Sequence, residues 1–336
     1  MGSETRIGDV AQAAGVSIRT VSRVLNKSPK VNAATRAKIE QAIAELNFRP
    51  SARARALALR RSFLIGLIHN DRNALVLDAI QRGVSALAAA NGYEVIVHST
   101  PLEAAEAIRD VLDFVERSRV DGLVVLPPVS GVTGLGAALA AQPIRAVALS
   151  SVGLEGFSEV LINAEREAGA DVARYLLELG HRDLGLVNGP ADTASATERR
   201  AGFLAEAARA GAKVREAPGD YDFASGVAAA EHLLGTGARP SAIFAANDIM
   251  AAGVLKVAAA RRIAVPGDLS VIGFDGSLLT RMLSPSLTSV LRPFGEMAAL
   301  AAERLIARIE ERAPPERRLP TMRIVPAEST GPAPVA

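Results

Sequence analysis

The sequence predicts an α/β protein with a small helical head at its N-terminus and a two-lobed body of parallel sheets. Three short segments with helical spacing of apolar residues occupy the first fifty of its 336 residues. Short apolar runs then alternate with alanine-rich helical stretches, the pattern of βαβ units. The net charge also differs between the N-terminal head and the rest of the chain. Residues 1–61 carry twelve Lys and Arg against four acids, net +8, and the rest carries 26 against 32, net −6.

The composition excludes several classes of protein. Cysteine and tryptophan are absent, which excludes disulfides, thiolate metal sites and cysteine nucleophiles. The first ten residues lack the apolar segment of a secretory signal, and no run of about 18 apolar residues predicts a membrane span. We therefore expect a cytoplasmic protein without cofactor, metal or membrane contact.

The head contains three predicted helices. The first lies over "IGDVAQAAG", and Gly15 ends it. The second follows the turn Gly15-Val16-Ser17, and Val21, Val24 and Leu25 form its apolar face. The third lies over "NAATRAKIEQAIAELNF" with Asn32 as its N-cap. Its predicted buried side comprises Ala37, Ile39, Ile43 and Leu46.

Two short helices about a glycine-containing turn, supported by a third, form a helix-turn-helix. In that motif the second helix lies in the DNA major groove, so Ser17, Ile18, Arg19 and Thr20 are expected to meet base edges and phosphates. The alternative is a small bundle with a solvated polar face. The net charge of +8 on the head favours nucleic acid.

The head ends in the basic segment "RPSARARALALRRS". As a free linker it would be disordered, but alanine and leucine favour a helix that could form against phosphates. Its only large apolar residues are Leu57 and Leu59, and nothing nearby in the sequence could bury them. A large apolar side chain offered to the minor groove can wedge between base steps and kink the duplex.

The head resembles the lactose-repressor (LacI) family of bacterial transcription regulators. The resemblance rests on Asp9-Val10-Ala11, Ala14-Gly15-Val16-Ser17, Thr20 to Asn26, Val31, Thr35-Arg36 and the segment from Pro50 to Ala58. It implies a hinge helix over residues 51–59 in the minor groove with Leu57 as its wedge, and a dimer on a near-palindromic operator. The DNA-binding residues are then Thr5, Arg6, Ser17, Ile18, Arg19, Thr20, Ser22, Arg23, Asn26, Arg53 and Leu57.

The body contains seven predicted strands: "FLIGLI", "YEVIVH", "DGLVVL", "IRAVAL", "DLGLVN", "SAIFAA" and "LSVIGF". Helical segments between them include 79–91, 102–118, 164–180, 196–211, 223–235 and 247–261. Because so many strands exceed one sheet of ordinary width, two lobes are expected. Ligands of such sheets bind beyond the carboxyl ends of the strands. These ends hold His69-Asn70-Asp71, Pro127-Pro128, Ser150-Ser151, Asn188-Gly189-Pro190, Asn247-Asp248 and Asp275-Gly276.

The body resembles the same family through "LGHRDLGLVNGP", "ERRAGF", "IFAANDIMAAGVL" and "LSVIGFDGSLL". The resemblance implies a periplasmic-binding-protein-like pair of lobes around a small-molecule effector. The implied parts are a DNA-binding domain (1–50), a hinge (51–61) and an effector-binding and dimerisation domain (62–330). Its N-lobe comprises about 62–160 and 292–319, and its C-lobe about 161–291 and 320–330. The effector-binding residues are then His69, Asn70, Ser150, Ser195, Arg199, Tyr221, Asn247 and Asp275.

Among these residues, Arg199 is expected to donate to the effector and Asp275 to accept from it. Tyr221 would supply an aromatic platform. Each has a structural alternative: a salt bridge on a helix face for Arg199, core packing for Tyr221, and a helix N-cap for Asn247, which could both cap and bind.

The chain departs from the family pattern in its ligand region. The segment after the first strand is "NDRNALVLDAI" where many relatives have an aromatic "PFF"-like segment, and Ile162 precedes Asn163 where many have Asp. Ser150 stands where the lactose repressor has a ligand-binding Asp. A sugar or sugar derivative remains the favoured effector.

Two other classes of protein are weighed against a regulator. An α/β enzyme is disfavoured because no GxxxxGK[ST], HExxH or GxSxG motif occurs and "GVTGLG" has the wrong glycine spacing for a dinucleotide loop. His181 is interpreted as a helix cap. A ligand-binding protein of the periplasmic type would share the body but would carry a signal peptide and no basic head. The ending "PAESTGPAPVA" has no heptads for a tetramer, so a homodimer is expected.

Overall fold

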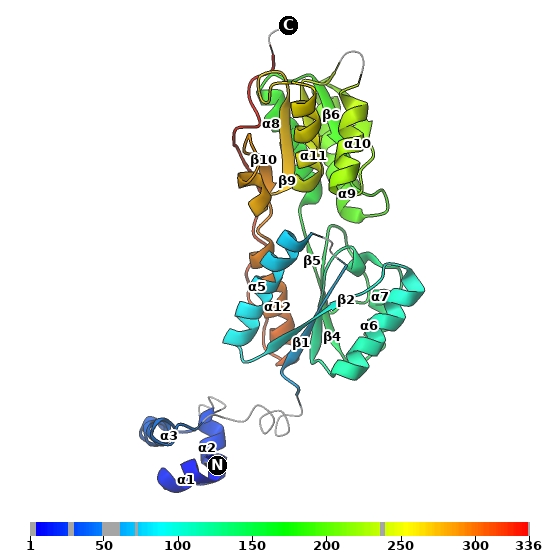
Figure 1. Cartoon of the computed structure of the whole chain (residues 1–336). Coiled ribbons are helices and arrows are strands. Elements are labelled where there is room, and N and C mark those ends of the chain that lie inside the picture. Colours follow the sequence, from blue (N-terminus) through cyan, green and yellow to red (C-terminus); the bar gives the residue numbers. More distant parts are fainter. Residues whose placement is uncertain (1–4, 26–29, 49–60, 71–72, 236–238, 335–336) are drawn as a thin grey trace. The chain divides into compact units, whose positions relative to one another are not determined.

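The computed structural model describes residues 5–25, 30–48, 61–70, 73–235 and 239–334. The chain divides into two compact units, Met1–Ser62 and Phe63–Ala336 (Figure 1). Asn26, Arg53 and Leu57, and with them the expected hinge helix, lie outside the described residues. The helices of the first unit are α1 (Ile7–Ala13), α2 (Ile18–Leu25) and α3 (Ala33–Glu45).

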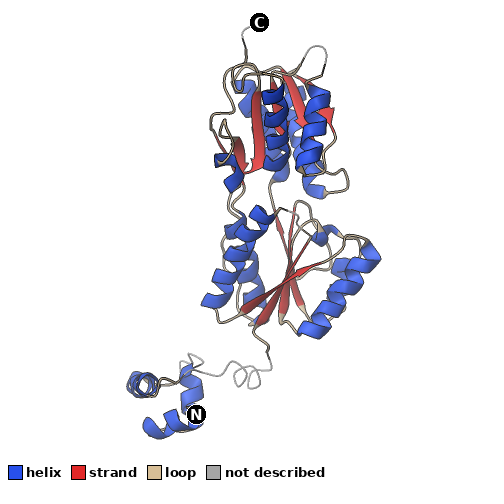
Figure 2. Ribbon diagram, viewed as in Figure 1, coloured by secondary structure: helices blue, strands red, loops and turns tan. Residues whose placement is uncertain are grey.

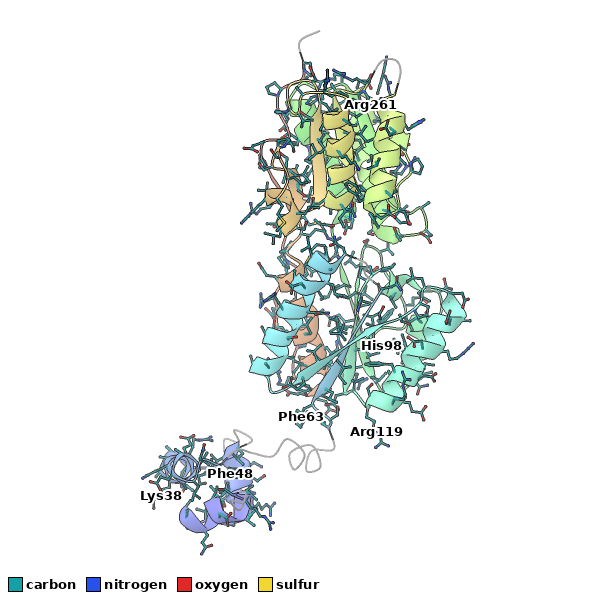
Figure 3. The ribbon with its side chains drawn as sticks, viewed as in Figure 1. Lys38, Phe48, Phe63, His98, Arg119 and Arg261 are labelled. Atoms are coloured by element: carbon teal, nitrogen blue, oxygen red, sulfur yellow. The ribbon has the colours of Figure 1, made fainter. Side chains whose placement is uncertain are left out.

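The three helices of the first unit pack around a small apolar core. Val21 and Val24 are buried there and Leu25 packs against them, which confirms the predicted apolar face of α2. The side chain of Phe48, labelled in Figure 3, is buried in the same core. With so short a helix, this tertiary packing is what stabilises α2.

The predicted start of α3 is confirmed, because the side chain of Asn32 accepts a hydrogen bond from Thr35 N at 2.8 Å. The prediction that Ala37 lies on its buried side is wrong, since Ala37 is exposed. The buried stripe follows Ile39 and Ala42. A residue two positions before Ile39 lies about 200° around the helix, on the solvent side.

The second unit contains two sheets with helices on both faces, as Figure 2 shows. The first sheet is parallel in all its pairings and has the strand order β2-β1-β3-β4-β5. Its strands are β1 (Leu64–His69), β2 (Glu94–Ser99), β3 (Gly122–Val125), β4 (Arg145–Ser150) and β5 (Glu159–Ile162). Around it lie α5 (Ala74–Ala90), α6 (Ala104–Ser118), the 3₁₀ turn η1 (Val129–Gly131), α7 (Leu135–Ala140) and α12 (Phe294–Ile309).

The second sheet has the order β11-β10-β9-β8-β6-β7, parallel except for the pair β10–β11. Its strands are β6 (Asp183–Val187), β7 (Lys213–Ala217), β8 (Ala242–Ala245), β9 (Ser270–Asp275), β10 (Thr288–Leu291) and β11 (Arg323–Val325). Its helices are α8 (Glu165–Glu178), α9 (Ala194–Arg209), α10 (Phe223–Leu233), α11 (Asp248–Ala260) and the 3₁₀ turn η2 (Leu278–Arg281). One core packs α8 and α9 on the sheet and another packs α10 and α11.

The chain passes between the two sheets at three places: between β5 and α8, between β10 and α12, and between α12 and β11. The seven strands expected from apolar runs are confirmed. Four strands lacked such a run, namely β5, β7, β10 and β11. In β11 half-buried and exposed residues alternate, and in β7 only the last residue, Ala217, is buried, so neither strand needs a continuous apolar run.

Within the described residues, no helix combines the length and the apolar character that a bilayer span requires.

Candidate functional site

The second helix of the head presents polar and charged side chains opposite its buried face. Ser17, Ile18, Arg19 and Arg23 are exposed, while Thr20 and Ser22 are half-buried. Ile18 is unusual for an aliphatic residue, because 54% of its surface is exposed. This face therefore offers hydroxyl, guanidinium and aliphatic groups together, the set that reads base edges and phosphates in a major groove.

Local geometry fixes the start of this helix. Gly15 has φ +65°, a backbone conformation that the turn requires and that glycine adopts without strain. Ser17 Oγ accepts from Thr20 N at 3.2 Å and lies 2.9 Å from Thr20 Oγ1. The N-cap thus fixes two of the expected DNA-contacting side chains relative to each other.

Two further residues that are expected to contact DNA lie directly before the first helix. Thr5 is half-buried, and its hydroxyl donates to Leu46 O at 3.3 Å. Arg6 is exposed at the N-terminus of α1, where its backbone N–H donates to Asp9 Oδ2 at 2.7 Å. The backbone bond leaves the guanidinium of Arg6 on the surface.

The eight residues expected at an effector all lie at carboxyl ends of strands or in the segments that follow. His69, Ser150 and Asp275 end β1, β4 and β9. Ser195 and Arg199 lie on α9 behind β6, and Tyr221 and Asn247 follow β7 and β8. Asn70 follows β1 and donates to Thr100 O at 2.5 Å. Ser150 Oγ accepts from Val152 N at 3.2 Å.

Ser195, Tyr221 and Asn247 are brought together. The hydroxyls of Ser195 and Tyr221 lie 3.5 Å apart, and Asn247 Nδ2 donates to Tyr221 O at 2.9 Å. Asn247 Oδ1 accepts from Met250 N at 2.8 Å, which confirms its N-cap role. Tyr221 and Asp275 have φ of +59° and +111°, conformations that cost a non-glycine residue energy and that the surrounding structure must hold.

A buried network of four charged side chains lies beside these residues. Glu165 Oε2 accepts from Arg199 Nη2 at 2.8 Å and Nε at 3.1 Å, and Glu165 Oε1 lies 2.9 Å from Arg292 Nη2. Arg292 Nη1 lies 3.7 Å from Asp275 Oδ1. The Arg199 guanidinium also donates to Ala246 O and stacks 3.6 Å from the centroid of the Phe274 ring. The network therefore contains two cations and two anions.

The two cations decide the ionisation of Glu165. Burial raises the pKa of its carboxyl, but Arg292 and Arg199 together outweigh burial, so the pKa lies below its ordinary value. For Arg199, burial lowers the pKa, but the charge of Glu165 first, and then that of Asp275, raise it above its ordinary value. Both groups are therefore charged in the folded protein.

Close packing of α8 on α9 brings Glu165 to Arg199. Gly169 lies against the backbone of Arg199, and Gly202 lies against the backbone of Arg166. Any side chain at either glycine would collide with main-chain atoms and push the helices apart. The two glycines thus set the distance across which the buried ion pair forms.

Asp248, the first residue of α11, anchors the segment behind Asp275. Its carboxylate accepts from Ser277 N at 2.8 Å, Ser277 Oγ at 2.9 Å and Ser289 Oγ at 2.5 Å. Burial raises its pKa to about 6, although these hydrogen bonds oppose the shift. Asp248 therefore connects the start of α11 to the loop after β9 and to β10.

A cavity of about 410 Å³ lies where this loop meets the N-terminus of α5. Asp275 at the end of β9 and Ser277 and Leu278 in the segment after it line the cavity from one lobe, and Leu75, Val76 and Asp78 on α5 line it from the other. Arg292 lines it from the segment between β10 and α12, and Phe294 and Glu296 line it from the first turn of α12. Of the eight expected effector residues, Asp275 alone is among the residues that line this cavity.

Sequence reasoning missed Glu165, Asp248 and Arg292 as site residues. A glutamate in the first turn of a helix is ordinarily a solvated residue that complements the helix dipole, so Glu165 gave no signal. The sequence placed Asp248 at the end of a strand beside Asn247 but indicated no role for it. Arg292 stood outside every motif.

His181 is buried in the second sheet's lobe. Its Nδ1 lies 2.9 Å from Ser241 Oγ, and its Nε2 lies 3.1 Å from Ser270 Oγ and from Gly331 O. Burial lowers the pKa of this histidine. It connects the residue before β8 and the first residue of β9 to the segment after β11, which is a structural role.

The chain is similar to bacterial repressors along almost its whole length. Residues 6–51 match the family described as bacterial regulatory proteins, lacI family, and residues 173–330 match the periplasmic binding protein-like domain. The ribose operon repressor of Escherichia coli is 34% identical over 93% of this chain and 95% of its own length. The repressor PurR of Pectobacterium atrosepticum is 33% identical over 90% of each chain.

Solved structures agree with these relatives. A lac repressor dimer bound to operator and the anti-inducer ONPF matches with a TM-score of 0.77 and 28% identity over 98% of this chain and 100% of that one. The complex of the transcriptional regulator CelR with cellobiose matches with a TM-score of 0.71 and 27% identity over 97% and 99%. The basic helix-turn-helix head, the two-lobed body and these full-length similarities lead to one conclusion: the chain belongs to the LacI family of bacterial regulatory proteins.

Proposed function

We propose that this regulator represses transcription by binding a near-palindromic operator as a homodimer, with α2 of each head in the major groove. The observation that carries the proposal is the exposed face of α2 on a head with net charge +8. Ser17, Ile18, Arg19, Thr20, Ser22 and Arg23 read bases or bind phosphates, while Thr5 and Arg6 bind the backbone near α1. From the sequence alone, Asn26 extends this contact, and Arg53 and Leu57 enter the minor groove.

The body binds a small-molecule effector between its lobes. Support comes from the positions of His69, Asn70, Ser150, Ser195, Tyr221 and Asp275 at the carboxyl ends of strands. Asn247 supports Tyr221 by its hydrogen bond, and Arg199 supports the floor of the site through its stacking on Phe274. A sugar or sugar derivative is the proposed effector class. The ribose operon repressor and the complex of CelR with cellobiose, to which the chain is similar, favour this class.

Effector binding alters operator affinity through the segments that join the lobes. DNA binding by a dimer requires two heads at a spacing of one or a few helical turns. A ligand that binds two lobe arrangements with different affinity shifts the equilibrium between them, and thus the spacing of the heads. We infer a cytoplasmic location, where DNA is accessible, and a regulatory rather than enzymatic role.

The test uses the full chain. Repeated selection of random duplexes should converge on a near-palindromic sequence. The logarithm of affinity for that sequence should fall steeply with the logarithm of salt concentration, because two heads of +8 displace many counterions. A control duplex with both half-sites scrambled should bind only weakly. Recovery of no preferred sequence, together with a flat salt dependence, would refute the DNA-binding proposal.

The effector half of the proposal is tested separately. Sugars, nucleobases and amino acids are screened for those that raise the melting temperature of the full chain, since a ligand that binds the folded state stabilises it by mass action. A ligand found in this way should also change affinity for the selected operator. A stabilising ligand that leaves operator affinity unchanged would contradict allosteric control.

A further inference from the structure

A second cavity, of about 220 Å³, lies at two of the three crossovers, the segments in which the chain passes between the sheets. Ile162 and Ala164 line it where the chain leaves β5 for α8, and Leu319 and Met322 line it between α12 and β11. Met297 of α12 forms another part of its wall. None of the eight residues expected at an effector is among its lining residues. The cavity is therefore distinct from the proposed effector site.

The wall of this second cavity is mainly apolar. Seven of its eleven lining residues are aliphatic, proline or methionine. Met297 is buried, and a methionine side chain adapts to the shape of a neighbour because it is unbranched and polarizable. Two carboxylates, Glu167 and Asp171, also line the cavity, but both residues are exposed, and Asp171 pairs with Arg174 at 2.6 Å. Because water and this pairing screen the two charges, the apolar wall decides what the cavity binds.

Ile162 extends the apolar wall to the surface of the body. It is an aliphatic residue at the end of β5, yet 53% of its surface is exposed. A ligand in the cavity that covers this side chain removes apolar surface from water, which favours binding. An apolar cavity of about 150 Å³ is already large enough to bind benzene. The volume of about 220 Å³ therefore suits a somewhat larger aromatic molecule, such as one with two fused rings.

The crossover from β5 to α8 contains an unpaired polar atom. Asn163 lies in this crossover and lines the cavity, and it is only 4% exposed. Its Oδ1 is buried and has no hydrogen-bond partner among the described residues. A buried acceptor without a donor is unfavourable, so an arrangement of the crossover that pairs this atom would gain a hydrogen bond. Segments that join two lobes are where hinge motions take place, and a cavity between two of them changes shape when they move.

We propose that this cavity is a second, allosteric site that binds an uncharged aromatic molecule of about the size of indole. A ligand between the two crossovers favours the arrangement of the lobes that fits it, and so shifts the equilibrium between arrangements. Coupling between two sites is reciprocal, so this ligand and operator DNA change each other's affinity by the same factor. Binding to the cavity is independent of the proposed function, whereas the effect on DNA rests on it.

The first experiment titrates the full chain with indole in the absence of DNA. The chain contains no tryptophan, so indole fluorescence can be excited selectively, without a background from the protein. We expect saturable binding to one site per chain, with emission shifted to shorter wavelength because the ring leaves water. Excess D-ribose, the polar control, should not displace indole. Displacement by D-ribose would overturn the proposal, as would the lack of saturable binding up to the solubility limit of indole.

The second experiment tests the wall of the cavity. Ile162→Asp replaces an exposed aliphatic side chain by a carboxylate and should weaken indole by about tenfold or more. Ala164→Leu fills part of the same cavity and should also weaken indole. Val325→Asp is the matched control, because Val325 is another exposed aliphatic residue at the end of a strand but is not among the lining residues. Unchanged indole affinity in Ile162→Asp would overturn the assignment. If Ile162→Asp does not fold, Ala164→Leu decides in the same way.

The third experiment measures the affinity of the full chain for the selected operator with and without saturating indole. We expect a change of at least about fivefold in the wild type and in Val325→Asp, and a smaller change or none in Ile162→Asp. Indole that binds the cavity without changing operator affinity would overturn the allosteric role. Failure of operator selection with the wild type would count against the regulator proposal and leave the indole titrations unaffected.

Discussion

Asn247 connects the start of α11 to the backbone of Tyr221. Its Oδ1 accepts from Met250 N at 2.8 Å, and its Nδ2 donates to Tyr221 O at 2.9 Å. One amide thereby caps a helix and holds an aromatic residue that has a positive φ. The bond to Tyr221 explains how an unfavourable backbone conformation persists beside the site.

Replacement of Asn247 separates these two roles. Asn247→Ala should lower the free energy of unfolding by about 1–2 kcal/mol, because it removes the cap and leaves buried polar groups unpaired. Asn247→Asp keeps an acceptor for Met250 N but loses the donor to Tyr221, so it should retain more stability and still weaken sugar binding. Chemical denaturation and calorimetry of the full chain measure both effects. Equal sugar affinity in the wild type and Asn247→Asp would show that Tyr221 needs no such support.

Arg19 should read a base and not only a phosphate. Arg19 is exposed at the start of α2 and can donate to the O6 and N7 of a guanine. Arg19→Ala should cost about 1–3 kcal/mol of binding free energy on the selected operator and relax specificity at one position. Lys38→Ala, on the exposed surface of α3 (Figure 3), removes the same charge and should weaken all duplexes slightly and equally. An equal loss for all sequences with Arg19→Ala would make Arg19 a phosphate contact.

Leu57, which lies outside the described residues, is predicted from the sequence to wedge into the centre of the operator. Leu57→Ala keeps helix propensity and charge but removes the side chain that unstacks a base step at a cost of a few kcal/mol. We expect weaker specific binding and loss of DNA bending, measured by fluorescence transfer between the ends of a labelled operator. Leu59→Ala is the matched control in the same segment. A Leu57→Ala protein that bends the operator as the wild type does would make the segment a passive tether.

Asp248 should make stability depend on pH in a predictable direction. Its pKa is about 6 in the folded protein, whereas its ordinary value is 3.8, so the folded state binds the extra proton between these values. This carboxyl therefore stabilises the fold increasingly as the pH falls from about 7 towards 4. The difference in melting temperature between the wild type and Asp248→Asn should therefore increase in favour of the wild type as the pH falls from about 7 to about 4. The exposed Asp220→Asn control should show no such trend. A pH-independent difference between wild type and Asp248→Asn would refute the shift.

The organisation of the chain could be predicted from local patterns. Val21 and Val24 marked the buried face of α2 because helical periodicity is a property of neighbouring residues. The continuous apolar runs of β1 and β9 marked strands buried on both faces. Asn247 could be recognised as an N-cap for the same reason, since its partner Met250 lies three residues away. The helix-turn-helix head and the alternating body followed from such short-range signals, and the class of regulator followed from the resemblance of their motifs to the LacI family.

Only the tertiary structure decided which charged side chains form the buried network. Glu165 and Arg292 are 127 positions apart in the sequence, yet their side chains lie 2.9 Å apart and buried. The family motif predicted that Arg199 binds a ligand. In the structure α8 approaches α9 closely at Gly169 and Gly202, and the Arg199 guanidinium donates to Glu165. A buried charge is stable only next to an opposite charge, and the packing of distant segments decides which one lies within reach. The sequence by itself therefore determined the three helices of the head, seven of the strands and the family, whereas the packing of distant segments decided which arginine faces the cavity of about 410 Å³.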